Sequence, residues 1–284
     1  MRIAALHTYP VKGCHRLDHT EARVEPWGLA GDRRWMAIDA DGVGITQRTT
    51  TRLVGLRPLP HPAGLTLRAT ALPDLDEPLP VLPDLLVTEP IDGPKVHVRV
   101  FSSQPPVPAR LAADDAHTWL TALLGRPARL AWLGDPTVRP VNPEHGTNSD
   151  RVSFADGYPI LVTTTASLAA VNEWLHEAGD DPVPMTRFRP NVVVDGGPAW
   201  VEDTWLGRRL RIGGIVVRAA KPCDRCVVTT IDQDTAEKGR QPLRALGVHR
   251  NFAQGLLFGV NLIPDSGAGD TGIIRVGETV ELLP

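Results

Sequence analysis

Proline recurs throughout this chain and limits the length of its helices. The sequence has 27 prolines in 284 residues, about twice the usual share of roughly 5%. Because proline lacks a backbone N–H and clashes with the preceding helical turn, a chain interrupted this often favours short strands over long helices. We therefore expect a mainly β fold with some α structure.

Extended segments are expected along the whole chain. The dipeptide Asp41-Gly42 is typical of a hairpin turn, and residues 95–101 alternate polar and apolar side chains with the period of a half-buried strand. Residues 76–94 are expected to form an irregular surface crossing. Strands are expected over residues 1–12, 35–39, 191–194, 209–217, 227–231 and 255–263, with a final hairpin around Gly277-Glu278.

Two segments carry the signals of helices. Asp114 or Asp115 can cap a helix that ends at Gly125, and Thr165 can cap a second one that ends at Gly179. Strands and helices do not alternate along the chain, which disfavours a parallel α/β sheet. A β-barrel core with a few packed helices fits the pattern better.

Charge and hydrophobic pattern exclude several classes of partner. The formal net charge is −3, so the chain lacks the basic excess that a nucleic-acid partner requires. The N-terminal segment has no continuous apolar core like that of a signal peptide, and no apolar run reaches the roughly 18 residues of a membrane span. Three cysteines do not make a disulfide framework. We expect a cytoplasmic protein without a nucleic-acid or membrane partner.

The segment KPCDRCVVTTIDQDT, residues 221–235, places two thiols three positions apart. Cys223 and Cys226 follow an apolar stretch and precede a β-branched one, so we expect them at a bend between two strands. A thiolate is a soft metal ligand and a strong nucleophile. Such a site could bind a metal, exchange electrons or attack a substrate.

The pair alone leaves several alternatives open. A structural zinc site needs four ligands, and with only one CxxC in the chain, Cys14, His7 and His15 are candidates to complete the set. A thioredoxin-like site would open a helix, whereas the residues after Cys226 favour a strand. Two small buried hydrophobic residues are the third alternative, because most free cysteines behave that way.

Three further motifs combine a cation with a fixed backbone. YPVKG ends a strand at Lys12, GDRRW places Asp32 beside Arg33, and RFRPN joins Arg189 to Asn191. Pro190 is expected to hold Arg189 in an extended conformation. Arginine forks followed by an amide suit an anionic ligand that is rich in hydrogen-bonding groups.

These motifs occur in one order: YPVKG, GDRRW, FADGYP, RFRPN, WVEDTW and KPCDRCVVTTIDQDT. In this order the chain resembles the MOSC-domain proteins with a MOSC N-terminal β-barrel domain, a group that includes the mitochondrial amidoxime-reducing component and bacterial relatives. The resemblance extends over the whole chain. It implies a MOSC β-barrel fold plus an N-terminal β-barrel-like domain with a few packed helices, divided into residues 1–118 and 119–284.

The resemblance also implies a molybdenum cofactor, in which one pyranopterin and one protein cysteine hold the metal. Cys226 matches the ligand and catalytic cysteine, and Cys223 is its neighbour. Gly13 stands where eukaryotic relatives have serine, and Gly157-Tyr158 replaces a pair of small hydroxyl residues. Asp156 and Asn191 either pair with pterin nitrogens or orient the arginines. The implied cofactor-binding residues are Lys12, Gly13, Arg33, Asp156, Tyr158, Arg189, Asn191 and Cys226.

The activity implied by the resemblance is a molybdenum-dependent reduction of N-hydroxylated compounds to amines or amidines. The sequence ends at Pro284, so we expect the electrons to come from a separate flavin or iron–sulfur protein. His249 and Asp232 are the candidates for a general acid, although a structural role suits each better. The alternatives are a carrier of molybdenum cofactor or sulfur without turnover, and a cofactor-free redox switch.

Overall fold

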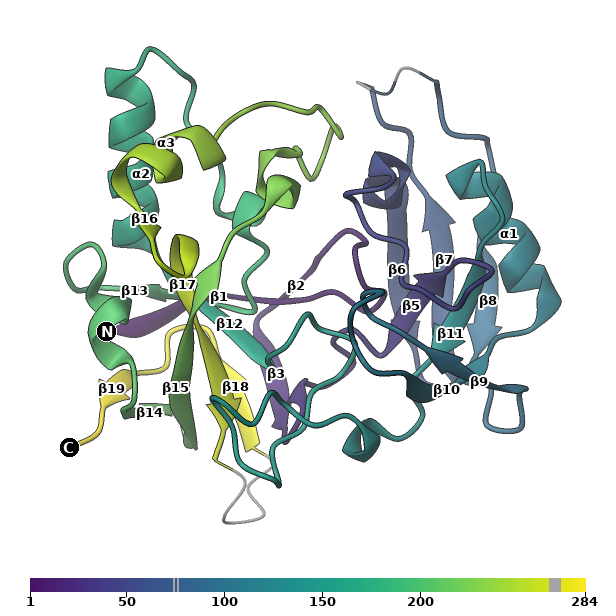
Figure 1. Ribbon diagram of the computed structural model, residues 1–284, viewed down its shortest axis with the longest axis horizontal. Coiled ribbons are helices and arrows are strands. Elements are labelled where there is room, and N and C mark those ends of the chain that lie inside the picture. The colour runs from purple at the N-terminus through teal and green to yellow at the C-terminus, as the bar shows by residue number, and fades with distance from the viewer. Residues whose placement is uncertain (74, 76, 266–271) are drawn as a thin grey trace.

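Two lobes of mainly β structure lie side by side in the computed structural model (Figure 1), which describes residues 1–73, 75, 77–265 and 272–284. The N-terminal lobe contains strands β5 to β11 and helix α1. The C-terminal lobe contains β1 to β4 and β12 to β19, with helices α2 and α3. The expected fold class, mainly β with a few packed helices, is confirmed.

The C-terminal lobe is built on a large sheet, which has nine strands in the described part of the chain. Its order is β19-β14-β15-β17-β12-β13-β1-β2, with β16 paired to β17; β12 and β13 are parallel and the other pairs are antiparallel. The strands are β1 (Arg2–Thr8), β2 (Leu17–His19), β12 (Ile160–Thr164), β13 (Val192–Asp195), β14 (Arg209–Ile212), β15 (Ile215–Asp224), β16 (Asn251–Phe252), β17 (Gly255–Pro264) and β19 (Val280–Leu282).

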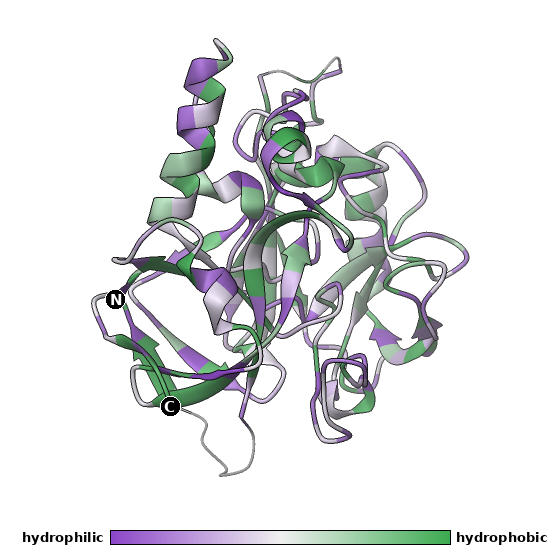
Figure 2. Ribbon diagram, turned by 60° about the vertical axis from the view of Figure 1, so that its left-hand side comes forward, coloured by the Kyte–Doolittle hydropathy of each residue, from purple (hydrophilic) through white to green (hydrophobic). Residues whose placement is uncertain are grey.

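A smaller sheet, β18-β3-β4, closes over the large one: β3 (Glu21–Glu25), β4 (Gly28–Leu29) and β18 (Gly272–Arg275). Val24 and Ile274 from this sheet share one buried cluster with Val162 and Leu262 of the large sheet and with Trp205. Figure 2 shows the corresponding concentration of hydrophobic residues in the strands of this lobe. The two sheets therefore enclose a common core.

The first strands of the chain lie with its last ones. β1 pairs with β13, placing Leu6 opposite Val192, and β3 pairs with β18, placing Ala22 opposite Ile274. In space β1 to β4 thus belong to the C-terminal lobe, whereas Tyr9, Val11 and Cys14, between β1 and β2, are buried in the cluster of the N-terminal lobe. The division of the sequence after residue 118 stays a prediction.

The N-terminal lobe holds two sheets and one helix. The first sheet has the order β5-β11-β10-β9, and the second has the order β6-β7-β8. Trp119, Leu120 and Leu123 of α1 are buried in the cluster that contains Trp35 and Leu67. The elements are β5 (Trp35–Ile38), β6 (Leu56–His61), β7 (Gly64–Ala69), β8 (Leu85–Thr88), β9 (Lys95–Val98), β10 (Val107–Leu111), β11 (Arg129–Trp132), α1 (Asp114–Leu124) and the 3-10 helix η1 (Thr51–Gly55).

Both predicted helices are present with small shifts at their starts. The N-cap of α1 is Ala113, and Gly125 ends the helix in the left-handed conformation with φ 66°. Helix α2 (Thr165–Glu177) is capped by Thr164, whose hydroxyl accepts from the Ser167 N–H. The remaining helices are α3 (Leu243–His249), η2 (Pro136–Val138), η3 (Met185–Phe188), η4 (Val201–Trp205) and η5 (Val227–Thr230). No helix among the described residues is long and apolar enough to cross a membrane.

The expected strand over residues 227–231 is wrong, because this segment forms the 3-10 helix η5. Thr229 donates its hydroxyl to the Cys226 carbonyl at 2.9 Å, and Thr230 donates to the Val227 carbonyl at 2.8 Å. The threonine hydroxyls thereby satisfy carbonyls at the start of a turn. These hydrogen bonds hold the chain after Cys226 in a compact turn.

Three other expectations need correction. The strand predicted over residues 209–217 is a hairpin, since Gly213 turns with φ 55° between β14 and β15. The segment predicted to be irregular, residues 76–94, contains β8, which pairs with β7; its first residue, 76, lies outside the described part. The final turn is present at Gly277, with φ 90°, but β18 pairs with β3 and β19 pairs with β14.

A buried carboxyl joins three elements of the C-terminal lobe. Glu202 of η4 is fully buried and accepts from the hydroxyls of Thr164 at 3.0 Å and Ser167 at 2.9 Å. The Ser167 hydroxyl in turn accepts from the Trp200 N–H at 2.8 Å. Burial raises the pKa of Glu202 above its ordinary value of 4.5. The protonated form is therefore favoured in the folded state.

We predict that Glu202→Gln flattens the pH dependence of stability. A raised folded-state pKa gives stability that is complete below about pH 4.5 and is lost as pH rises through the folded-state pKa. The wild type should lose free energy of unfolding relative to the variant above this pH, by at most about 1.4 kcal/mol per pH unit. Urea unfolding between pH 5 and pH 8 measures the difference. Glu177→Gln, at an exposed position on α2, is the control, and parallel curves for Glu202→Gln and wild type would contradict the prediction.

Candidate functional site

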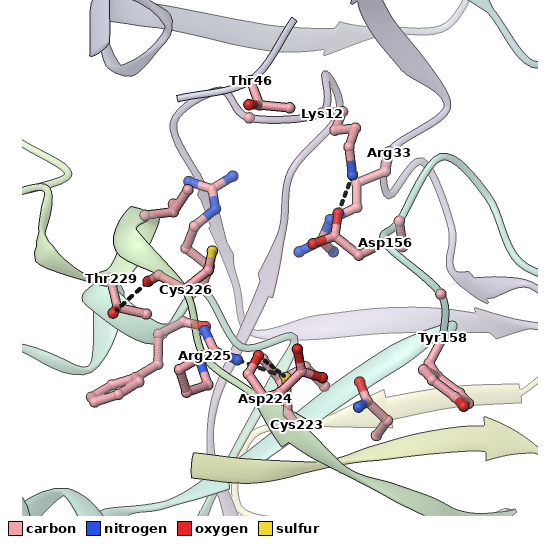
Figure 3. Close-up of a pocket in the computed structure, with 18 of the residues that line it drawn as sticks. Lys12, Arg33, Thr46, Asp156, Tyr158, Cys223, Asp224, Arg225, Cys226 and Thr229 are labelled. Atoms are coloured by element: carbon pink, nitrogen blue, oxygen red, sulfur yellow. Dashed lines mark hydrogen bonds and ion pairs between the residues drawn. The ribbon is translucent and has the colours of Figure 1, made fainter. Parts of the chain in front are cut away.

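A cavity of about 320 Å³ contains all eight residues that the sequence singled out for cofactor binding. Its walls come from both lobes (Figure 3). In the close-up, Lys12, Arg33 and Asp156 lie on one side, and Cys226 and Cys223 lie across from them. The predicted residues on its walls are Lys12, Gly13, Arg33, Asp156, Tyr158, Arg189, Asn191 and Cys226.

Lys12 lies on the buried side of the cavity and forms an ion pair with Asp156. A parallel bridge between Val11 and Trp35 fixes the backbone before it. Burial lowers the pKa of Lys12 to about 8, although Asp156 opposes this shift. Burial alone would raise the pKa of Asp156, but Lys12, Arg33 and Arg48 together lower it to about 2. The pair therefore carries opposite charges at neutral pH.

Arg139 holds the loop that presents Asp156, although it belongs to none of the motifs named above. Its buried guanidinium donates to the carbonyls of Ser153 and Ala155 and, at 3.1 Å, to that of Asp156. Burial lowers the pKa of Arg139 to about 10. The loop is thus tied to a cation at three successive points, and Asp156 projects from a fixed backbone.

Arg33 is presented by a strained backbone. It adopts the left-handed conformation with φ 49°, which costs a non-glycine residue about 1–3 kcal/mol. Asp32, which is buried, binds the Arg33 guanidinium with one oxygen and the Tyr9 N–H, at 2.8 Å, with the other. The Arg33 guanidinium also lies 4.5 Å from the centre of the Tyr9 ring. The Asp-Arg pair of GDRRW orients the cation as the motif suggested.

Arg189 contradicts the expectation of an extended conformation. Its backbone is left-handed, with φ 53° and ψ 46°. The guanidinium donates to the Cys14 carbonyl at 2.8 Å and to Gln233 Oε1 at 2.7 Å, and it lies 4.2 Å from the centre of the Tyr9 ring. These contacts offset the steric preference that Pro190 imposes. Tyr9 therefore has a guanidinium close to its ring from each of the two motifs.

Asn191 orients other groups of the site. Its side-chain oxygen accepts from the Leu161 N–H at 3.1 Å and from Arg33 at 3.3 Å, and its amide donates to the His7 carbonyl at 3.2 Å. Of the two roles considered for this residue, the contacts favour orientation of an arginine. Asn191 also ties β1 to β12, because His7 and Leu161 belong to these strands.

Two buried glutamines join the lobes across the floor of the site. Gln47 and Gln233 exchange amide hydrogen bonds at 2.9 and 3.0 Å. Gln47 also donates to the Gly13 carbonyl at 2.7 Å, and Gln233 accepts from Arg189. Gln233 lies within the 221–235 segment, but its partner is 186 positions away. Sequence spacing therefore gave no signal for the pair.

The two thiols of the motif have different surroundings. Cys223, in β15, accepts from Arg225 at 2.8 Å, and burial raises its pKa although Arg225 opposes the shift. Cys226 occupies the N-cap position of η5 and accepts from Arg48 at 3.3 Å. Arg48 comes from the N-terminal lobe. Both thiols line the cavity, but among the described residues only the Cys226 sulfur accepts a hydrogen bond from the opposite lobe.

The third cysteine takes no part in the site. Cys14 is fully buried, its thiol donates to the His15 carbonyl, and burial raises its pKa to about 12. Within the described residues, no group of three or more His, Cys, Asp and Glu side chains could hold a metal ion. The zinc alternative therefore finds no support in the structure.

Positive charge dominates the cavity. Six cationic side chains face two carboxylates, an excess of four positive charges in a chain whose net charge is −3. Such a concentration of cations attracts an anionic ligand. The cationic residues are Lys12, Arg33, Arg48, Arg189, Lys221 and Arg225, and the carboxylates belong to Asp156 and Asp224.

The remaining candidates divide between the cavity and the surface. Tyr158 lines the cavity, and burial raises its pKa to about 12, so its phenol stays protonated. Asp232 binds Arg187 at 3.1 Å, and His249 stacks on Trp174 at 4.2 Å. Neither is among the residues that line the cavity, and both have structural partners.

Two family models match the chain. The MOSC N-terminal beta barrel domain matches residues 1–127, and the MOSC domain matches residues 149–281. Mitochondrial amidoxime-reducing component 1 of Mus musculus is 31% identical in an alignment of 296 positions that covers 99% of this chain and 82% of that protein. Mitochondrial amidoxime reducing component 2 of Homo sapiens is 33% identical over 258 residues, covering 87% of this chain and 72% of that protein.

Both family matches and the nearly full-length similarity agree with the order of motifs along the sequence. The chain belongs to the family of MOSC-domain proteins with a MOSC N-terminal β-barrel domain, together with the mitochondrial amidoxime-reducing components.

Proposed function

We propose that this protein is a molybdenum-cofactor-dependent oxidoreductase that reduces N-hydroxylated compounds to amines or amidines. The observation that carries the proposal is a cavity with a cationic wall on one side and the Cys226 thiol on the other. The names of its relatives, which refer to amidoxime reduction, support the substrate class. Hydroxylamines, amidoximes and N-hydroxylated bases are the expected substrates.

The residues on the cationic wall fit the phosphate of a pyranopterin. In the described chain only Nη1 of Arg33 donates hydrogen bonds, to Asp32 and Asn191. Nε and Nη2 are therefore available to a ligand. Lys12 has three donors, of which Asp156 takes one. The Gly13 N–H has no hydrogen-bond partner among the described residues. We assign these three groups to the phosphate.

Arg189 adds both charge and hydrogen-bond donors to this wall. Two of its five N–H donors bind Gln233 and the Cys14 carbonyl in the described chain, which holds the guanidinium in place and leaves the other donors available to a ligand. Cys226 supplies a soft thiolate ligand for the metal. The donor set therefore suits a ligand that combines an anionic group with a thiophilic metal.

When bound, the cofactor supplies the redox chemistry in which the N-hydroxylated substrate, two electrons and two protons give the amine or amidine and water. The chain binds and orients the reactants. Phe101 and Phe188 cover part of the cavity wall and exclude water from it. A separate flavin or iron–sulfur protein is the proposed electron donor.

Metal analysis and a turnover assay test the proposal. Freshly purified protein should contain molybdenum and should reduce benzamidoxime to benzamidine with an artificial electron donor. Molybdenum without turnover would favour a carrier of the cofactor. Protein without molybdenum or turnover, after expression in a host that makes the cofactor, would favour the redox switch.

Exchange of the two cysteines should have unequal effects. Cys226→Ser removes the proposed metal ligand and should lower turnover by more than the roughly 100-fold that loss of an outer contact of a metal site costs. Cys223→Ser keeps that ligand and should retain a larger share of activity. Steady-state rates and molybdenum content measure both effects. Equal losses in the two variants would return the site to a redox pair.

Arg189→Gln should weaken cofactor binding. Loss of a charged hydrogen-bonding group costs about 1.5–3 kcal/mol, which corresponds to roughly 10- to 100-fold in affinity. Molybdenum content after dialysis measures the loss, and thermal unfolding of both proteins reports whether the fold is retained. Arg244→Gln, at an exposed position on α3, is the control. Full occupancy in a folded Arg189→Gln protein would contradict the anchoring role.

A further inference from the structure

Each thiol of the motif has its own arginine, and the two arginines come from different lobes. Arg225 donates Nη1 to Cys223 at 2.8 Å, and Arg48 donates Nη2 to Cys226 at 3.3 Å. Arg225 lies two positions from its thiol, whereas Arg48 is 178 positions from Cys226. The proposed metal ligand is therefore the thiol that receives its hydrogen bond across the cavity.

The loop that carries Arg48 is held at the residues just before it. Gln47 is 2% exposed, and its amide nitrogen donates to the Gly13 carbonyl and to Gln233. The Arg48 N–H donates to the Thr46 hydroxyl at 3.3 Å. Because Gln47 is fixed by residues of the C-terminal lobe, the next residue along the chain emerges at a defined place over the cavity.

The Arg48 side chain is guided by an aromatic ring. Its guanidinium carbon lies 5.0 Å from the centre of the Phe101 ring, and Lys12 Nζ lies at the same distance from that ring. Such a cation–π contact favours a guanidinium that is held near the face of the ring. Phe101 thus places two cations in the cavity, one paired with Asp156 and the other with the Cys226 sulfur.

Arg225 offers a built-in comparison. It donates Nη2 to the Phe188 carbonyl at 2.5 Å and lies 5.6 Å from the centre of the Phe188 ring. Both anchors belong to the C-terminal lobe, so Arg225 and Cys223 form a local unit. An arginine therefore donates to each thiol, but the donor to the proposed metal ligand, Arg48, comes from the N-terminal lobe.

We propose that Arg48 is a positioning residue that tunes the metal through its ligand, by donating a charge-assisted N–H···S hydrogen bond to the Cys226 thiolate. The proposal rests on the proposed function. A hydrogen bond to a coordinated sulfur withdraws electron density from it and stabilises the more electron-rich state of the metal. Arg48 thereby raises the reduction potential of the centre and makes its reduction by the donor protein easier.

Redox titration of the cofactor-loaded protein, followed by the electron paramagnetic resonance signal of Mo(V), tests this role. Arg48→Met should shift the midpoint potentials to more negative values and change the Mo(V) signal. Arg48→Lys, which keeps a charged donor, should recover part of the shift. Arg225→Met is the matched control. It removes the same charge from the same cavity, but Arg225 donates to the other thiol, so the shift in midpoint potential should be smaller.

The outcomes separate this inference from the proposed function. A wild-type protein without molybdenum or a Mo(V) signal would overturn both. A wild-type signal with unchanged potentials in Arg48→Met, or equal shifts in Arg48→Met and Arg225→Met, would overturn the role of Arg48 alone. A raised KM at unchanged potentials would make Arg48 a substrate contact instead. If Arg48→Met fails to retain the cofactor, Arg48→Gln and Arg225→Gln replace the two methionine variants: a larger shift in Arg48→Gln supports the hydrogen bond, and an equal or smaller one overturns it.

Discussion

The cost of removing cations from water shapes this site more than any other interaction. Lys12 and Arg189 are 5% and 9% exposed, and removal of an ion from water costs several kcal/mol unless partners replace the hydration. Asp32 and Asp156 supply part of that replacement, and carbonyls, amides and the Tyr9 ring supply more. An excess of positive charge nevertheless remains in the cavity. An anionic ligand would complete the compensation, so its binding would also stabilise the fold.

Backbone strain follows from the same constraint. Arg33 and Arg189 both adopt left-handed conformations, and both guanidiniums lie close to the Tyr9 ring. Tyr9 is itself fixed at both ends, since its N–H donates to Asp32 and its hydroxyl donates to the Pro190 carbonyl at 3.1 Å. The strain at the two arginines is balanced by contacts that converge on one residue. Tyr9 stands in the YPVKG motif, where Lys12 was the residue that sequence reasoning singled out.

The place of a residue in the structure could be predicted where a sequence motif indicates its chemistry. It could not be predicted where the place depends on a partner far away in the sequence. The eight cofactor-binding candidates, each of which belongs to a recognisable motif, line one cavity. The β-branched run after Cys226 favoured a strand, yet its threonine hydroxyls close a 3-10 turn. Arg139 and Gln47 carry no local signal, because their roles depend on carbonyls and amides elsewhere in the chain. The position of β1 in the C-terminal lobe is likewise a matter of long-range pairing.

The different settings of the two thiols follow from what each neighbouring arginine is bound to. Arg225 is committed to the Phe188 carbonyl as well as to Cys223, so the sulfur of Cys223 belongs to a closed local network. Arg48 is exposed and has no other side-chain acceptor in the described chain than Cys226. A metal that binds Cys226 would share the sulfur with this one donor without breaking the wall behind it. The spacing of the cysteines is that of a chelating pair, but their surroundings suit a centre with a single protein thiolate.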